Sequence, residues 1–444
     1  MEILQNCSNK ITKQIYNKEV RYKISPYTII RQYENYKIAF SSISYCCIVF
    51  DISEEKSLKE FFVENWFLTP ENIDDYEIIS KVKKEISTDI VEKTNLDNLQ
   101  RFTIYTTTDC NARCYYCFEN ELTYVTDYMS LETASNLADL LTKEYNTTKN
   151  KLMLIWYGGE PFLNEDVISL VCKKLKENNV DFESHFITNA SLLTKEKVDR
   201  CKTEYNGVFF QISLDGVDEQ YKKSKRYIID DIDILNNILE IISYIIEQNI
   251  KIEIRLNLGL KNLDELKALV DILANDHKGK QNVRVYGAPI YGLLDSHPEE
   301  IKQYSEELDT YIKRVFYDDF RKKNITLPHI ATLKCTVDQN LTIGIRENGT
   351  VVACTRPGDS YVFGNICTDK SEWDIENLKR IKQRMVSDSC KKCFTVLSCN
   401  LPYICGVGIK CTDEALELRK RDLETTIEKI FNKYIAKHND SNTD

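Results

Sequence analysis

The chain lacks long apolar runs. None of its 444 residues belongs to a run of 18 consecutive apolar residues, the length at which a segment becomes a candidate membrane helix. The N-terminus, MEILQNCSNK, also lacks the basic segment and the apolar core of a signal peptide. The sequence therefore predicts a cytoplasmic protein that does not use a membrane as a partner.

Basic residues are fewer than acidic residues. The 59 Lys and Arg residues are outnumbered by 69 Asp and Glu residues, which gives a net charge of −10. This balance argues against a broad surface for nucleic acid or anionic lipid, so we expect no nucleic-acid partner. Repeats and low-complexity tracts are absent from the sequence, and its length favours two or three globular domains.

Cysteine, by contrast, is abundant, with 16 residues. In a reducing compartment this favours metal binding or redox chemistry over disulfides. Three cysteines lie in DCNARCYYCFEN (109–120), and eight more lie between residues 335 and 411. The others have no ligand spacing, and we interpret them as buried structural thiols: Cys7, Cys46, Cys47, Cys172 and Cys201.

Residues 101–325 alternate between strand-like and helix-like patterns. Strands are predicted at 102–108, 152–159, 184–190, 208–216, 251–258 and 283–289, with helices near 165–178, 194–204, 231–249 and 262–275. A further helix is predicted to begin after Ser130 as N-cap, with Leu131, Ala134, Leu137 and Leu141 on one face. This order predicts an α/β fold with a parallel sheet, and six units favour a partial (β/α)6 barrel over a closed barrel of eight. Functional residues are then expected at the C-terminal ends of the strands.

Three segments flank this region. Residues 1–95 combine short strands with helical stretches and predict a small α+β domain. Residues 326–411 hold the second cysteine group, and residues 412–444 predict a charged helix and a polar tail.

Cys110, Cys114 and Cys117 directly follow the first predicted strand, with the spacing C-x3-C-x2-C. A zinc site usually has four protein ligands, or three and a water. A [4Fe–4S] cluster takes one ligand per iron, so three cysteines would leave one iron open. A zinc or other structural loop is the alternative interpretation.

The motif and its surroundings resemble the radical S-adenosylmethionine (radical SAM) superfamily. Its C-x3-C-x-aromatic-C signature is matched with Tyr116 in the aromatic slot, and YGGEP (157–161), ITNA (187–190) and ISLDG (212–216) end the next three strands in the family's order. The resemblance implies that the open iron binds S-adenosylmethionine and that one electron cleaves it to methionine and a 5′-deoxyadenosyl radical, which abstracts hydrogen from the substrate.

The resemblance also implies a set of contacts with S-adenosylmethionine. Glu160 would hold the methionine ammonium, Tyr116 would pack on the adenine, and Arg226 would pair with the carboxylate. The full set is Tyr116, Gly158, Gly159, Glu160, Asn189, Ser213 and Arg226. Turn formation and capping are the structural alternatives, and the sequence identifies no catalytic base.

The second cysteine group resembles the SPASM extension of radical SAM enzymes that modify peptides and proteins. Gly349-x4-Cys354 follows Cys335, and a C-x2-C-x5-C run precedes the last two cysteines. The resemblance implies two auxiliary [4Fe–4S] clusters. The distal one would take Cys390, Cys393, Cys399 and Cys411, and the nearer one Cys335, Cys354 and Cys405.

Two departures from that pattern concern the nearer cluster. Leu341 occupies a position where the family often has a further cysteine, and the spacing between Cys399 and Cys405 is longer than is common. The nearer cluster would then have three protein ligands, unless Cys367 supplies a fourth. A pair of zinc ribbons is the alternative.

These resemblances predict a peptide maturase that forms a cross-link, a thioether from cysteine sulfur to carbon, in a ribosomally made precursor peptide. Residues 1–95 would hold the peptide's leader by strand addition or would serve only as a structural cap. The expected electron donor is a low-potential flavodoxin or ferredoxin. Two alternatives are oxidation of a protein Cys or Ser to formylglycine, and an iron–sulfur electron-transfer scaffold without radical chemistry.

Overall fold

The computed structural model describes residues 1–5, 13–44, 46–117, 127–228, 233–290, 293–317, 340–355, 361–383, 393–394 and 413–440. The chain divides into two compact units. One is built mainly from Met1–Lys93 and Lys382–Asp444, and the other from Thr94–Lys323 and Gln339–Ile381. Within the described residues, no helix is long and apolar enough to cross a membrane.

The larger unit contains a sheet with the strand order β12-β11-β10-β9-β8-β7-β13-β14-β15. Its first six strands are parallel and follow one another along the chain: β7 (Arg101–Tyr105), β8 (Leu152–Tyr157), β9 (Phe182–Thr188), β10 (Gly207–Leu214), β11 (Lys251–Leu258) and β12 (Val283–Pro289). The predicted α/β fold with a six-stranded parallel sheet is confirmed, and the predicted strands differ from the observed ones by only a few residues at their ends.

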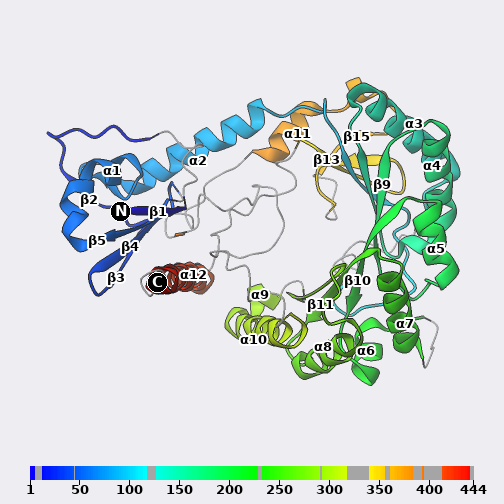
Figure 1. Ribbon diagram of the computed structural model, residues 1–444. Helices are drawn as coiled ribbons and strands as arrows, with labels where there is room; N and C mark the ends of the chain where they lie inside the picture. Colours follow the sequence, from blue (N-terminus) through cyan, green and yellow to red (C-terminus); the bar gives the residue numbers. More distant parts are fainter. Residues whose placement is uncertain are drawn as a thin grey trace. The chain divides into compact units, whose positions relative to one another are not determined.

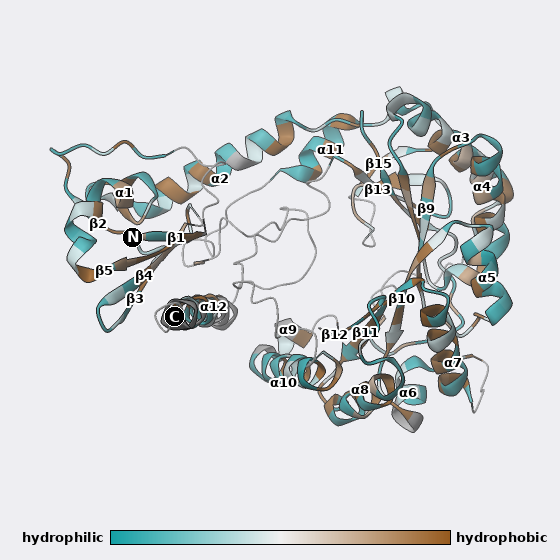
Figure 2. Cartoon of the chain, viewed as in Figure 1, coloured by the Kyte–Doolittle hydropathy of each residue, from teal (hydrophilic) through white to brown (hydrophobic). Residues whose placement is uncertain are grey.

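Helices cover one face of this sheet (Figure 1). They are α3 (Leu131–Thr148), α4 (Glu165–Glu177), α5 (Lys195–Thr203), α6 (Asp218–Lys225), α7 (Ile234–Glu247), α8 (Leu263–His277) and α10 (Pro298–Phe316), with the short η4 (Pro161–Asn164) and α9 (Leu293–Ser296). The covering helices carry both teal and brown residues (Figure 2), as expected where one side of a helix packs on a sheet and the other meets solvent.

Helix α3 begins as the sequence predicts. The Ser130 hydroxyl accepts a hydrogen bond from the Thr133 N–H at 3.0 Å, which satisfies one of the helix's unpaired N-terminal donors. Ala134, Leu137 and Leu141 are fully buried, but Leu131 is 57% exposed. Leu131 is the first residue of the helix, so the buried part of the predicted face begins at Ala134.

Strands β8 and β9 alternate between buried and half-exposed side chains. The buried set faces the helices: Cys172 of α4, for example, lies 3.9 Å from the hydroxyl of Ser184 on β9. The half-exposed set, which includes Tyr157, occupies the opposite, concave face. Because the parallel strands share one direction, their carboxyl ends and the loops that follow meet along a single edge.

The described residues after 340 extend the same sheet. Strand β13 (Thr342–Ile345) pairs parallel with β7, and β14 (Thr350–Val352) and β15 (Val362–Asn365) follow as antiparallel strands. The short η7 (Lys370–Glu372) and α11 (Ile375–Lys382) come next. The first part of the cysteine-rich segment therefore continues the barrel sheet.

The smaller unit contains a four-stranded antiparallel sheet in the order β1-β5-β4-β3 and a two-stranded sheet, β2-β6. Its elements are β1 (Glu2–Gln5), β2 (Tyr22–Ile24), β3 (Thr28–Tyr33), β4 (Tyr36–Ser41), β5 (Cys47–Asp51), η2 (Ile52–Leu58), α1 (Lys59–Glu64), β6 (Leu68–Pro70), α2 (Asp75–Glu92) and α12 (Asp413–Asp440). One core cluster joins the sheet to the C-terminal helix, and in it Tyr33 stacks on Phe431 with ring centroids 4.1 Å apart. The two ends of the chain thus build one hydrophobic core.

A buried ion pair attaches the segment after β15 to α3. The Lys370 ammonium lies 2.6 Å from the Glu144 carboxylate and 3.0 Å from the carbonyl oxygen of Leu96. The Glu144 side chain is 2% exposed and that of Lys370 is 23% exposed, so the pair brings a cation to a buried carboxylate. Nearby, Lys143 and Asp369 form a second pair at 2.9 Å with both side chains exposed.

We expect Lys370→Met to lower the free energy of unfolding by roughly 2–4 kcal/mol, because it leaves a buried carboxylate without its cation. Chemical denaturation of the purified protein measures this loss. Adding Glu144→Leu should restore most of it, since the apolar pair removes the uncompensated charge. Lys143→Met is the matched exposed control, with little expected effect. An equal loss in the single and the double variant would contradict this assignment.

Candidate functional site

The three-cysteine loop leaves the sheet at the carboxyl end of β7. Cys110, Cys114 and Cys117 are half-buried, and a turn brings the Cys117 N–H to 3.1 Å from the Cys114 carbonyl oxygen. The C-terminal end of α6 supports the loop, because the Arg113 N–H donates to the Lys225 carbonyl oxygen at 2.9 Å. The first predicted strand and its cysteine loop are therefore placed as the sequence indicates.

Gly158 and Gly159 bring the end of β8 against the backbone of this loop. A Cβ on Gly158 would lie 2.2 Å from the Thr107 carbonyl oxygen, and one on Gly159 would lie 2.1 Å from that of Asp109. Gly158 also has a φ of +132°, where L-residues are strained. The glycines allow the Gly159 and Glu160 N–H groups to donate to Thr107 and Asp109 at 3.1 and 2.9 Å. The backbone at Gly158 and Gly159 therefore lies directly against the start of the cysteine loop.

Glu160 is fully buried behind the glycines. Its carboxylate accepts hydrogen bonds from the Thr188 hydroxyl at 2.7 Å and from the N–H groups of Asn189 and Phe162 at 2.8 and 3.3 Å. Burial raises its pKa to about 7, although these hydrogen bonds oppose the shift. The side chain therefore joins the ends of β8 and β9, and its contact with a methionine ammonium stays a prediction.

Asn189 follows β9 and faces the cysteine loop. Its amide nitrogen donates to the Asn111 side-chain oxygen at 2.9 Å and lies 3.8 Å from the Cys110 sulfur. Its own side-chain oxygen accepts from Ser191. The structure thus brings Asn189 to the loop, as expected of a residue at this edge.

The Tyr116 hydroxyl enters a buried polar network at the ends of β10 and β11. It donates to the Asp215 carboxylate at 2.5 Å and accepts from the Asn257 amide at 3.0 Å. Asn257 also donates to Asp215 at 2.9 Å. These contacts hold the aromatic ring of the motif in a defined position, while its packing on adenine stays a prediction.

Ser213 and Arg226 are placed differently from each other. The Ser213 hydroxyl accepts from the Lys225 ammonium at 2.8 Å inside the network. Arg226 is exposed and its guanidinium donates to the Lys223 carbonyl oxygen of its own helix at 3.3 Å. Arg226 is the C-cap of α6 and has a left-handed φ of 50°. The backbone reverses direction at this residue, and the Arg226 side chain is exposed.

Lys225 is the site residue that the sequence analysis missed. Its side chain is 3% exposed and its ammonium lies 3.5 Å from the Asp215 carboxylate, which is 1% exposed. Burial alone would lower the pKa of Lys225, but Asp215 and other neighbours outweigh it and hold this pKa well above its usual value. Both residues lie beside positions that the sequence analysis singled out, since Asp215 belongs to ISLDG and Lys225 adjoins Arg226. No local sequence pattern, however, shows that the two charges meet in the fold.

The three thiols lie in one short loop, as the ligands of a cluster would. A [4Fe–4S] cube takes one protein ligand per iron, so each thiolate would bind a different iron. Burial raises the pKa of Cys110 to about 12 and also raises that of Cys114, where Lys225 opposes the shift. Ligation by iron would supply the positive charge that the thiolates need.

The C-terminal cysteines are described only in part. Cys335, Cys390, Cys399, Cys405 and Cys411 lie outside the described residues. Cys393 is 4% exposed and belongs to a core cluster of the smaller unit with Tyr27, Ile43, Ile79 and Leu416. Cys354 follows β14, and the next residue, Thr355, accepts a hydrogen bond from the Tyr105 hydroxyl at 2.5 Å.

Cys354 and Cys367 lie at opposite ends of the β14–β15 ladder. Cys354 follows the Val352–Val362 pair, and Cys367 follows the Thr350–Asn365 pair at the other end. Strand geometry separates them by roughly 15 Å. Cys367 is also exposed, with its sulfur 3.6 Å from the Asn136 amide of α3. A shared cluster on Cys354 and Cys367 would have to span the length of this ladder, so a ligand role for Cys367 stays a prediction.

The cysteines interpreted as structural are buried wherever they are described. Cys46, Cys47, Cys172 and Cys201 are all buried. Cys7 lies outside the described residues.

Comparisons with known proteins agree with this site. Residues 104–288 match the radical SAM superfamily. AlbA of Bacillus subtilis (strain 168), the antilisterial bacteriocin subtilosin biosynthesis protein, is 28% identical over 120 residues, which are 26% of this chain and 24% of AlbA. The match thus spans about a quarter of that relative.

Two solved structures share the fold. Native anSMEcpe with bound AdoMet and Cp18Cys peptide has a TM-score of 0.56 at 15% identity, over 77% of this chain and 99% of that one. Streptococcus suis SuiB bound to its precursor peptide SuiA has a TM-score of 0.50 at 15% identity, over 89% and 98%. The parallel sheet and the three-cysteine loop at the end of its first strand both lie within the match: residues 104–288 of this chain match the radical SAM superfamily.

Proposed function

We propose that this radical SAM protein is a peptide maturase that cleaves S-adenosylmethionine and installs a thioether cross-link in a ribosomally made precursor peptide. One observation supports the cleavage of S-adenosylmethionine. The three cysteines lie in one loop at the carboxyl end of β7, inside the family match, and the end of β8 packs against this loop. Such an edge is where parallel α/β folds carry their active sites.

Cys110, Cys114 and Cys117 would hold a [4Fe–4S] cluster with one open iron. The cluster, once reduced and with S-adenosylmethionine bound, supplies a carbon radical that abstracts hydrogen. Residues of this chain hold the cysteine loop in position. Asn189 and Glu160 fix the edge of the loop through the bonds described above. Tyr116 of the loop and Ser213 of β10 both enter the polar network that holds the loop at the ends of β10 and β11.

The peptide substrate is supported by the ligands of the structural neighbours, since SuiB was solved with a precursor peptide and anSMEcpe with the Cp18Cys peptide. AlbA, by its name, belongs to the biosynthesis of a bacteriocin. We therefore infer a cysteine-containing precursor with a leader as substrate. A low-potential flavodoxin or ferredoxin would deliver the electron in the reducing cytoplasm.

Auxiliary clusters would occupy the C-terminal cysteines. We propose that Cys390, Cys393, Cys399 and Cys411 hold one cluster and Cys335, Cys354 and Cys405 the other. The separation of Cys354 from Cys367 supports a vacancy on the second cluster. An open iron there would bind a substrate cysteine as thiolate, which is the atom that a thioether requires.

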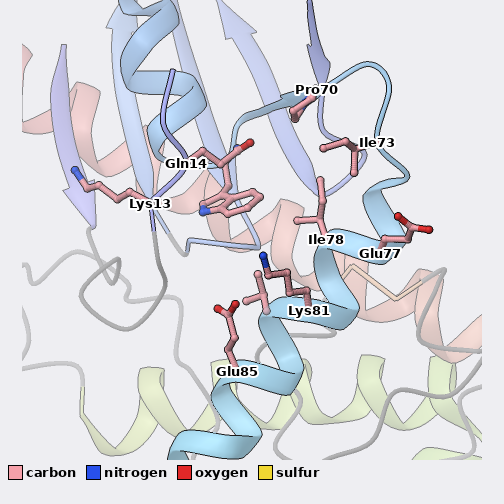
Figure 3. Close-up of a pocket in the computed structure, with 10 residues that line it drawn as sticks. Lys13, Gln14, Pro70, Ile73, Glu77, Ile78, Lys81 and Glu85 are labelled. Atoms are coloured by element: carbon pink, nitrogen blue, oxygen red, sulfur yellow. The ribbon is translucent and has the colours of Figure 1, made fainter. Parts of the chain in front are cut away.

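The leader would bind the smaller unit in a groove beside α2 (Figure 3). The groove has a volume of about 340 Å³, and its apolar lining comes from Trp66, Pro70, Ile73, Ile78 and Val82. Charged side chains border it on both walls: Lys13 on the N-terminal segment, and Glu77, Lys81 and Glu85 one turn apart along α2. A short extended segment with one large apolar side chain and flanking charges matches this surface.

The position of Trp66 favours a binding role for this groove. It has a φ of 61° just past the end of α1, where the Phe67 N–H donates to the Phe62 carbonyl oxygen at 2.8 Å. Glycine is the usual residue at such a helix end, and a bulky side chain there is strained. Strain of this kind concentrates at functional sites.

Replacing Cys110, Cys114 and Cys117 together by Ala should abolish formation of 5′-deoxyadenosine after anaerobic reconstitution with iron, sulfide and dithionite, because the open-iron cluster is lost. Iron analysis should show about four fewer iron atoms per chain. Cys201 is a buried thiol in α5. Cys201→Ala is therefore the matched control, and it should retain both the iron content and the formation of 5′-deoxyadenosine. Wild-type protein that binds iron but yields no 5′-deoxyadenosine would favour the electron-transfer scaffold.

Cys354→Ala and Cys367→Ala should differ. The first removes a ligand of the proposed nearer cluster, and we expect it to lower iron content and to abolish peptide modification. The second leaves iron content and product unchanged. Mass spectrometry of the co-expressed peptide reads out the product, as a loss of two hydrogens per cross-link with sulfur retained, whereas formylglycine formation from cysteine loses the sulfur. A loss of iron in Cys367→Ala would refute the vacancy.

Ile73→Glu should weaken binding of the precursor peptide at least about tenfold, because it places an unpaired charge in the apolar groove. Ile73 is 38% exposed, so the fold tolerates the change, and Ile24→Glu, at a 59% exposed position of β2, is the control. Fluorescence anisotropy of a labelled leader measures affinity. Cleavage of S-adenosylmethionine without peptide should be unchanged in both variants, and equal peptide affinity in both would rule out the groove.

A further inference from the structure

Lys225 and Asp215 form a fully buried ion pair beside the cysteine loop. Their side chains are 3% and 1% exposed, and the ammonium lies 3.5 Å from the carboxylate. Burying two charges carries a desolvation penalty before their attraction is counted, and an apolar pair of the same size is often as stable. Stability alone therefore gives a weak reason for this pair.

The pair is tied to the loop from three sides. The backbone carbonyl oxygen of Lys225 accepts from the Arg113 N–H at 2.9 Å, next to Cys114, and Ala112 and Tyr227 form a bridge between the two segments. Asp215 accepts from the Tyr116 hydroxyl at 2.5 Å, next to Cys117. The charges are therefore held at a fixed position relative to the loop by hydrogen bonds to residues between its cysteines.

The carboxylate is better satisfied by neutral donors than by its cation. Asn257 donates to it at 2.9 Å and Tyr116 at 2.5 Å, both shorter than the 3.5 Å to Lys225. The Lys225 ammonium lies closer to the neutral Ser213 hydroxyl, at 2.8 Å. The ammonium therefore lies nearer to a neutral hydroxyl than to its carboxylate, and its charge acts on the adjoining loop as well as on Asp215.

We propose that Lys225 is a positioning residue for electron transfer, whose buried ammonium stabilises the reduced state of the cluster on Cys110, Cys114 and Cys117, and that Asp215 moderates this effect. The inference rests on the proposed function, since it requires a cluster at this loop. Reduction adds one negative charge to the cluster, and a cation in a low-dielectric surrounding favours that state. Net charge and hydrogen bonding around a cluster are the protein's means of setting its potential.

Two substitutions should move the reduction potential in opposite directions. Lys225→Met removes the cation and should make the midpoint potential of this cluster more negative. Asp215→Asn removes the opposing anion, keeps the shape, and should make it more positive. Lys225→Arg keeps the charge and should stay near the wild-type value. Lys223→Met, which removes an exposed charge from the same helix, is the control and should leave the potential unchanged.

Redox titration followed by electron paramagnetic resonance measures these potentials, best in a protein whose C-terminal cluster ligand Cys354 is replaced by Ala to simplify the spectrum. Iron content verifies that each variant holds its cluster. Shifts of the same sign in Lys225→Met and Asp215→Asn, or no shift in either with the cluster intact, would overturn the inference. A wild-type protein without a reducible cluster on the three cysteines would refute the proposed function instead.

Discussion

The site depends on the contact between the backbones that leave β7 and β8. Gly159 lies so close to the Asp109 carbonyl oxygen that a Cβ would be 2.1 Å from it, and the N–H groups that follow bind this part of the loop. The contact fixes where the cysteine loop begins. It also places Glu160 directly behind the glycines, where its carboxylate reaches the end of β9. Three strand ends are thereby joined before any cofactor is considered.

The next strand ends are joined by charge and hydrogen bonding. Asp215, Asn257 and Lys225 are all buried at the ends of β10 and β11 and at the end of α6, and Tyr116 brings the cysteine loop into the same network. A polar network of this kind is costly unless its members are satisfied. Its members are paired with one another, so the network can hold the loop in one arrangement, and the same charges are available to act on whatever the loop binds.

The two units use the chain in different ways. The larger unit takes its strands in sequence order and then adds β13, β14 and β15 from beyond residue 340 beside β7. The smaller unit combines the first strands with the last helix, and the stacked rings of Tyr33 and Phe431 lie in their shared core. Removal of either terminus would expose apolar surface on the other, so the groove on this unit is better probed by single substitutions than by truncation.

The sequence by itself determined the order of strands and helices, the position of the cysteine loop and the family. Periodic apolar residues, the Ser130 cap and the glycine pair are local signals, and each acts within a few residues of the chain. Periodicity placed Leu131 on one face with Ala134, Leu137 and Leu141, but periodicity alone does not show where the covered surface ends, and Leu131 is exposed. Only the tertiary structure brought Lys225 to Asp215 and Tyr116, and only strand register separated Cys354 from Cys367. Such pairings depend on how distant strands align, and a charge that is spaced like any surface residue gives no sign in the sequence that folding will bury it.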